Sequence, residues 1–94
     1  MLLDRIKTAL RITHNRLDTD IEQHIFACIA DLARVGVAVP EDTEAVTPLL
    51  ETAVKIYVMA RYDFLGKGVQ YQTDYEKLRD ALSLSQKYRG DSDV

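Results

Sequence analysis

The chain has few of the residues that interrupt helices or cross-link small secreted domains. It contains one cysteine, Cys28, which excludes an intramolecular disulfide and fits a reducing compartment. Its two prolines and four glycines lie outside the periodic apolar stretches, apart from Pro48 at an expected helix start. No apolar run approaches the roughly 18 residues that a membrane span requires. These absences favour a helical protein with no membrane partner over a many-turned β fold.

A length of 94 residues predicts a single domain, residues 1–94. A chain this short buries a smaller fraction of its surface than a large domain does, so its stability margin is thin. Oligomerisation is a common way to compensate. We therefore expect a homo-oligomer.

The sequence also lacks a recognisable catalytic motif. The Gly66-Lys67-Gly68 segment has neither the spacing nor the strand–helix setting of a phosphate-binding loop. His24 and Cys28 are four residues apart on one expected helix face, with Asp20 a turn earlier, and all three residue types bind zinc. Because Cys28 lies within an apolar stripe and no second paired motif exists, we interpret it as a buried structural cysteine. We expect no enzyme activity, metal site or cofactor, and keep a minor enzyme or zinc protein as an alternative.

Apolar periodicity predicts an all-α, small four-helix domain with a long central apolar helix. The expected helices cover residues 2–12, 19–35, 48–65 and 74–88. The third is apolar on most sides and should therefore be central. A flexible loop is expected near residues 66–72 and a frayed tail at residues 90–94.

Residues at the expected helix ends support this division. Residues 19–22 and 73–76 both fit a capping box, in which a threonine hydroxyl and a glutamate three residues later satisfy backbone N–H groups reciprocally. Thr47 is an expected N-cap, followed by Pro48 at the first helical position. Gly36 suits the position just after the second helix, where a left-handed backbone is common.

Charge is distributed unevenly along the chain. The net charge is −3, yet residues 1–16 carry +3 and residues 17–54 carry −7. Opposite charge on two segments can steer neighbouring copies together, although a solvated surface is the plainer interpretation. The candidate interface residues from these segments are Arg5, Arg11, Asp18, Asp20 and Glu22.

Aromatic and arginine residues supply the remaining interface candidates. Tyr57, Arg61 and Tyr62 lie on or beside the third helix, where the plainer role is core packing and the functional role is contact with a neighbouring subunit. Val69 and Tyr71 look exposed in the expected loop. The C-terminal candidates are Tyr88 and Arg89.

A small helical DNA-binding regulator is the main alternative function. The acidic net charge argues against it, because free-standing nucleic-acid binders are usually basic. The second helix is acidic and the third too apolar for a DNA groove. The fourth helix is the only plausible reader, but acidic residues offset its basic ones: Lys77, Arg79, Lys87 and Arg89 against Asp74, Glu76 and Asp80.

The order of the segments resembles the tailed-bacteriophage head–tail connector family of DNA-packaging or head-completion adaptors. The resemblance starts at Leu10-Arg11-Ile12, which closes a short first helix, and continues at the acidic Leu17-Asp18-Thr19-Asp20-Ile21. It extends through the apolar run from Leu50 to Arg61 and a leucine-bearing last helix that ends in Tyr88-Arg89. It therefore covers nearly the whole chain.

This resemblance implies a structural protein without catalysis. Family members assemble as a ring that docks below the portal protein, extends the DNA channel and joins the head to neck or tail-completion proteins. DNA would pass through the channel without sequence-specific binding. The expected location is the head–tail junction of the virion, after assembly in the host cytoplasm.

Overall fold

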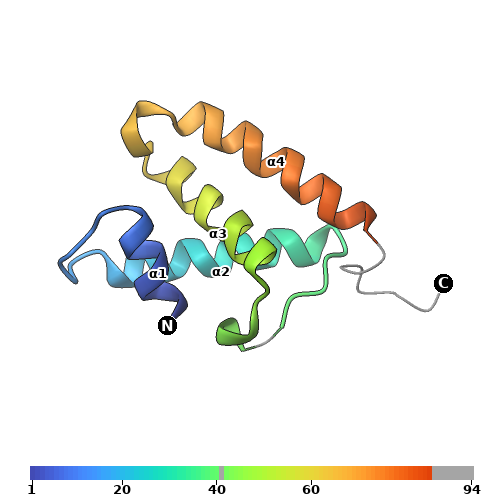
Figure 1. Cartoon of the computed structure of the whole chain (residues 1–94), viewed down its shortest axis with the longest axis horizontal. Helices are drawn as coiled ribbons and strands as arrows, with labels where there is room; N and C mark the ends of the chain where they lie inside the picture. Colours follow the sequence, from blue (N-terminus) through green and yellow to red (C-terminus); the bar gives the residue numbers. More distant parts are fainter. Residues whose placement is uncertain (41, 86–94) are drawn as a thin grey trace.

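The computed structural model describes residues 1–40 and 42–85. Within these residues the regular elements are four α-helices, α1 (Leu2–Ala9), α2 (Asp18–Arg34), α3 (Pro48–Arg61) and α4 (Gly68–Leu84). Two short 3-10 turns, η1 (Thr43–Ala45) and η2 (Phe64–Gly66), precede α3 and α4 (Figure 1). The all-α fold class is confirmed.

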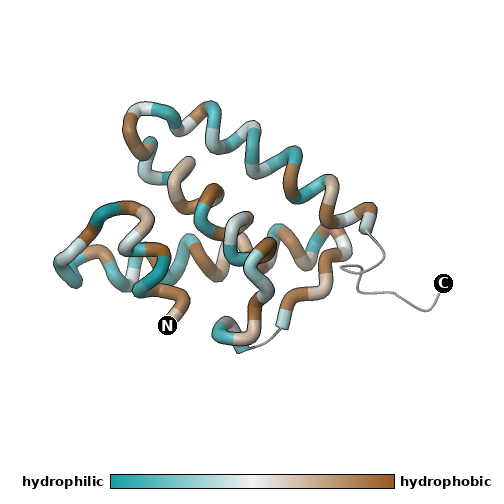
Figure 2. The backbone as a smooth tube through the Cα atoms, in the orientation of Figure 1, coloured by the Kyte–Doolittle hydropathy of each residue, from teal (hydrophilic) through white to brown (hydrophobic). Residues whose placement is uncertain are grey.

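Helix α3 contacts each of the other three helices. Figure 1 shows α4 returning alongside α3 after the η2 turn, with α2 passing beneath α3 and α1 next to the first half of α2. Hydrophobic segments recur along α2 and α3, whereas α4 is mostly hydrophilic (Figure 2). One apolar cluster lies between the helices, and its members buried to 2% exposure or less are Leu2, Ile6, Ile21, Cys28, Leu32, Leu50, Ala53, Val54, Val58, Tyr75 and Leu82.

The apolar stripe expected on the second helix packs into this core. Ile21, Ile25, Cys28 and Leu32 are buried on α2, at the three- and four-residue spacing of one helical face. The helix ends as expected at Gly36, whose φ is +90°. The Gly36 N–H donates to the carbonyl of Ala33, and the next N–H donates to the carbonyl of Leu32, both at 3.0 Å. This pair of bonds is the Schellman arrangement.

The start of α3 also agrees with the sequence. The Thr47 hydroxyl accepts a hydrogen bond from the Leu50 N–H at 3.3 Å, and Pro48 occupies the first helical position. The cap satisfies one of the backbone donors that the first turn of a helix leaves without a partner.

The first two helices differ from expectation at the end of α1 and at the start of α2. Helix α1 ends at Ala9 rather than at residue 12, and Arg11 follows with a φ of +61°. Helix α2 begins at Asp18, one residue early, after Leu17 as N-cap. The prediction of a capping box at residues 19–22 is wrong, because Thr19 already lies inside the helix and no side chain caps its start.

The largest correction lies between α3 and α4. Helix α3 ends at Arg61, four residues before the predicted end, so at 14 residues it is shorter than α2 and α4, each of 17. Asp63 and Leu65 take left-handed φ values of +49° and +56° and turn the chain sharply. The Asp63 carboxylate accepts a hydrogen bond from the Gly68 N–H at 2.7 Å. Helix α4 starts at Gly68, so the prediction of a flexible loop at residues 66–72 is wrong.

The second predicted capping box is wrong for the same reason. Thr73 is an interior residue of α4, and its hydroxyl donates to the Val69 carbonyl at 3.1 Å. The face predicted for the last helix is nevertheless right, since Tyr75 and Leu82 are buried and Leu78 packs partly against the core. The predicted tail at residues 90–94 lies outside the described residues.

Candidate functional site

Two of the four basic side chains in residues 1–16, Arg5 and Lys7, bind acidic residues of the same chain. Arg5 donates to the Glu51 carboxylate at 2.8 Å and to Glu44 at 3.4 Å. Hydrogen bonding to Glu51 is the main reason that the pKa of Arg5 is raised. Lys7 pairs with Asp18 at 2.7 Å. The opposite charges of the two segments thus meet within one molecule and tie α1 to α2 and to the start of α3.

Glu44 also orders the N-terminal end of the chain. Its carboxylate accepts a hydrogen bond from the Leu2 backbone N–H at 2.7 Å. That bond is the chief cause of the lowered pKa of Glu44. Since Leu2 opens α1, the carboxylate lies at the positive end of the helix dipole. The acidic connection before α3 therefore has a structural role at α1.

Asp20 and Tyr62 form a second intramolecular contact. The Tyr62 hydroxyl donates to the Asp20 carboxylate, and the Tyr62 ring meets His24 edge-on with ring centroids 5.4 Å apart. Burial and this carboxylate raise the pKa of Tyr62. Of the candidates near the start of α2, only Glu22 and Arg11 keep exposed side chains with neither an ion pair nor a hydrogen bond to the described residues.

Val69 and Tyr71, which follow the α3–α4 turn, differ in how far their side chains are exposed. Val69 is 85% exposed, as expected. Tyr71 is half-buried and packs against Phe64 with ring centroids 6.4 Å apart, which corrects its expected exposure. Leu65, a residue the sequence did not single out, is 61% exposed beside Val69. Tyr88 and Arg89 lie outside the described residues.

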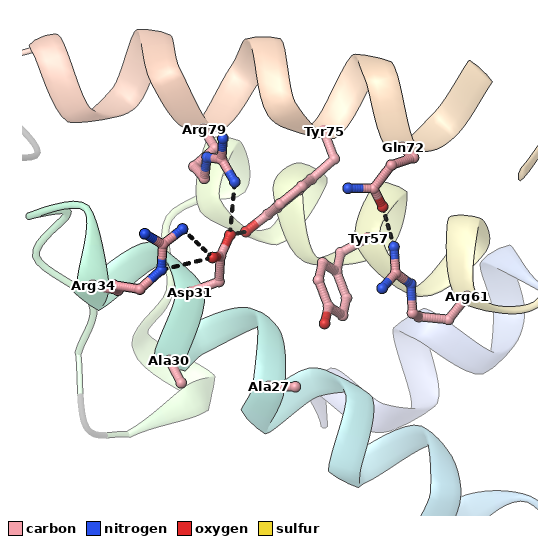
Figure 3. Close-up of a pocket in the computed structure, with 9 residues that line it drawn as sticks. All are labelled: Ala27, Ala30, Asp31, Arg34, Tyr57, Arg61, Gln72, Tyr75 and Arg79. Atoms are coloured by element: carbon pink, nitrogen blue, oxygen red, sulfur yellow. Dashed lines mark hydrogen bonds and ion pairs between the residues drawn. The ribbon is translucent and has the colours of Figure 1, made fainter. Parts of the chain in front are cut away.

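Tyr57 and Arg61 lie on one wall of a groove between α2, α3 and α4 (Figure 3). The Arg61 guanidinium stacks over the Tyr57 ring, 4.7 Å from its centroid, and donates to the Gln72 side chain of α4. The Tyr57 ring meets the Tyr75 ring edge-on at 5.1 Å. The packing role of this pair is visible in part, since Tyr57 is half-buried and the exposed Arg61 closes the polar edge, whereas contact with a neighbouring subunit stays a prediction.

The far wall of the groove is organised around Asp31 of α2. Its carboxylate accepts from Tyr75 at 2.7 Å, from Arg34 at 2.7 and 3.2 Å, and from Arg79 at 3.2 Å. Burial acts to raise the pKa of Asp31, but these donors outweigh it and hold the pKa below its usual range. Burial and the same carboxylate raise the pKa of Tyr75. One acid thereby fixes groups from two helices.

The groove has a volume of about 410 Å³ and carries an excess of positive charge. Three arginines, Arg34, Arg61 and Arg79, surround one carboxylate, Asp31. Ala27 and Ala30 line it with small side chains. Such a surface can accept anionic side chains, because guanidinium groups bind carboxylates in a planar, two-pronged way.

Sequence reasoning missed the groove residues Asp31, Arg34, Gln72 and Arg79 as members of one site. A signal was present, because residues 72, 75 and 79 share one face of a helix and residues 27, 31 and 34 share another. What the sequence did not supply was the pairing of those two faces, which depends on how α3 turns into α4.

Cys28 was the residue considered as a metal ligand or nucleophile, together with His24 and Asp20. Cys28 is fully buried, and burial raises the pKa of its thiol to about 12. This confirms the interpretation as a buried structural cysteine. Residues 1–40 and 42–85 contain no group of three or more histidine, cysteine or acidic side chains that could hold a metal ion. In the same part of the chain no helix is long and apolar enough to cross a membrane.

Comparison with known proteins gives one clear relationship. The family model described as phage connector protein matches residues 2–89, which is nearly the full length of the chain. No curated protein and no solved structure gives a significant match. The match runs through all four helices and therefore includes both the Asp31 groove and the pairing of α1 with the acidic segments.

Proposed function

The chain belongs to the phage connector protein family, and from this premise we propose that it is one subunit of a ring at the head–tail junction of a phage particle. The ring docks below the portal protein, extends the DNA channel and provides the surface on which a neck or tail-completion protein assembles. The subunit acts as a structural part and not as a catalyst. The observation that carries the proposal is the family match over residues 2–89 of an all-α chain.

The charge of the chain supports a role as a DNA conduit. A channel that lets DNA slide must avoid gripping the phosphates, and each lysine or arginine placed on a phosphate adds to that grip. The net charge here is −3. Two of the four basic side chains in residues 1–16, Arg5 and Lys7, are also paired with acids of the same chain. DNA then passes without sequence-specific binding.

A ring needs two different faces on each subunit, so that each copy binds the next in the same way. Arg5 and Asp18 are weak candidates for those faces, because they already have partners in their own chain. Arg11, Glu22, Arg61 and Val69 direct exposed side chains outward and are the better candidates.

The test is the native mass of the purified chain across a concentration series, alone and with tail-less phage heads. We expect a closed ring in solution, or stoichiometric addition to the portal vertex. Heads that lack portal protein are the matched control and should gain no chain. A monomer or dimer that ignores portal-bearing heads and binds duplex DNA in a salt-sensitive way would instead indicate the regulator function.

A further inference from the structure

Helix α2 carries two chemically different surfaces on the half that faces away from the core. One side carries Asp31 and Arg34 and forms part of the arginine-lined groove. The other carries Glu22 and Phe26, one turn apart, next to a small hollow of about 70 Å³. At 3.6 residues per turn, the nine residues from Glu22 to Asp31 place the two side chains about half a turn apart around the helix axis.

The Glu22 side is acidic and apolar at once. Phe26 is 58% exposed, and Met1, which lines the same hollow, is 75% exposed. Leu3 completes the apolar part of the rim. Exposed phenylalanine and methionine side chains beside one another are enriched at protein interfaces and depleted elsewhere on protein surfaces.

The groove offers the complementary surface. Its three arginines face one lining carboxylate, and Asp80 beside the groove pairs with Arg79 at 3.2 Å, which leaves an excess of one positive charge. Each guanidinium has five N–H donors, and the internal bonds of Arg34 and Arg61 use only some of them. The Arg34 side chain is 65% exposed. Tyr57 and the methyl groups of the two alanines add apolar lining against which a ring can pack.

We propose that the arginine-lined groove of one copy receives Glu22 and Phe26 of the next copy. Glu22 pairs with Arg61 at one end of the groove (Figure 3), and Phe26 packs against Tyr57 and Ala27. Because Glu22 and Asp31 point to opposite sides of α2, the two surfaces are distinct, and each copy can bind one neighbour through each. The contact is heterologous and propagates around a ring. This inference rests on the proposed ring function and names the surfaces that build it.

Duplex DNA is a poorer occupant of the same groove. The duplex carries a negative charge about every 1.7 Å along its axis, so it requires a long basic surface. The α4 edge of the groove instead continues into exposed acids, Glu76 and Asp80. Gln72 donates to Glu76 and Arg79 pairs with Asp80, so these acids border the groove and disfavour a long polyanion more than a single carboxylate.

A charge exchange tests the contact. Glu22→Arg and Arg61→Glu should each weaken self-association at least tenfold, measured as the concentration at half-assembly by sedimentation. The chain carrying both substitutions should recover most of that loss, because each new arginine meets a new carboxylate. Gln23→Arg, which places an arginine at the neighbouring exposed position of α2, is the control for an added cation and should assemble normally. Thermal melts confirm that each variant is folded.

The outcomes separate this inference from the proposed function. If the wild-type chain forms rings and Glu22→Arg forms them equally well, or the exchange restores nothing in folded protein, the ring stands and this interface is wrong. If the wild-type chain neither self-associates nor adds to portal-bearing heads, the ring and the interface both fail. Retention of a labelled 20-base-pair duplex by the wild type but not by Arg61→Glu would assign the groove to phosphate and overturn the proposal.

Discussion

The Tyr75 hydroxyl on α4 donates to the Asp31 carboxylate on α2 at 2.7 Å, joining residues 44 positions apart in the chain. The tyrosine ring itself is buried to 1% exposure in the core, and only its hydroxyl reaches the groove. The bond thus connects the apolar core to the polar groove. It fixes the position of α4, a helix that buries comparatively few side chains of its own.

Asp31→Asn should destabilise the protein by about 1–3 kcal/mol at pH 7, the range found for hydrogen bonds to charged groups. The substitution keeps the shape of the side chain but removes the charge that attracts Arg34 and Arg79. Urea unfolding followed by circular dichroism measures the change. Glu22→Gln removes an exposed carboxylate and should change the free energy of unfolding by less than about 0.5 kcal/mol.

The same pair predicts how stability depends on pH. The pKa of Asp31 is lower in the folded chain than the usual value of about 3.9. Its contribution is therefore present above about pH 4 and is lost as the pH falls through the folded-state pKa. The wild type should lose stability between about pH 4 and pH 2 more steeply than Asp31→Asn does. Equal slopes for the two chains would contradict the assigned role of the carboxylate.

The fold class and much of the core were predictable because apolar spacing records which face of each helix is buried. Ile21, Ile25, Cys28 and Leu32 illustrate this, since a three- or four-residue spacing has one simple meaning. The α3–α4 turn was not predictable. Asp63 and Leu65 adopt left-handed backbone angles without being glycine, and only contacts formed after folding select that conformation.

The groove was predictable only in part. Tyr57 and Arg61 were recognised from residue type and helical spacing. Asp31 was not, because an acid next to an apolar stripe looks like a solvated residue until a partner helix is placed opposite it. The two false capping boxes have a related cause, since Thr19 and Thr73 satisfy a local pattern while tertiary packing starts each helix earlier.

The difference between a true and a false cap gives a second prediction. Thr47→Ala should cost about 1 kcal/mol of stability, because the Leu50 N–H loses its acceptor at the start of α3. Thr19→Ala should be neutral or slightly stabilising, since Thr19 is an exposed interior residue of α2 and alanine is the better helix former. Thermal melts of the two variants against the wild type make the comparison. A cost at Thr19 as large as at Thr47 would mean that α2 is capped as the sequence pattern suggests.

The α3–α4 turn gives a third prediction. A methyl group added at Gly68 would lie 2.6 Å from the Asp63 carboxylate and 3.1 Å from the backbone of Ala60. Gly68→Ala should therefore destabilise the chain by about 1 kcal/mol or more, although alanine in a helix is normally better than glycine by about that amount. Chemical unfolding measures the difference.

Leu65→Gly is the companion variant at the same turn. Leu65 has a φ of +56°, a region that costs a residue with a side chain about 1–2 kcal/mol and costs glycine almost nothing. Its side chain is 61% exposed, so little burial is lost. The substitution should leave stability unchanged or raise it slightly. Destabilisation by more than about 1 kcal/mol would contradict this, because it would mean that the Leu65 side chain makes packing contacts that stabilise the fold.

Cys28 supplies the fourth prediction, on chemical reactivity. Its side chain is fully buried on α2, and burial raises the pKa of the thiol to about 12. The thiolate is the form that reacts with disulfide reagents, so at pH 8 only about one thiol in ten thousand is ready to react, against roughly a quarter at the usual pKa of about 8.5.

We therefore expect the native chain to react with an aromatic disulfide reagent far more slowly than the chain in strong denaturant, where Cys28 is exposed. The matched control is a Cys28→Ala, Ala33→Cys chain, which moves the thiol to an exposed position of the same helix and should react rapidly without denaturant. Because reaction of buried Cys28 requires the helices to open, its rate also reports local unfolding of α2 from the core. Asp31→Asn should accelerate it, since the loss of the charge weakens the bond to Tyr75 and loosens α4 over this part of α2. Rapid native labelling in the wild type would contradict the burial of Cys28 on which the structural interpretation of this residue rests.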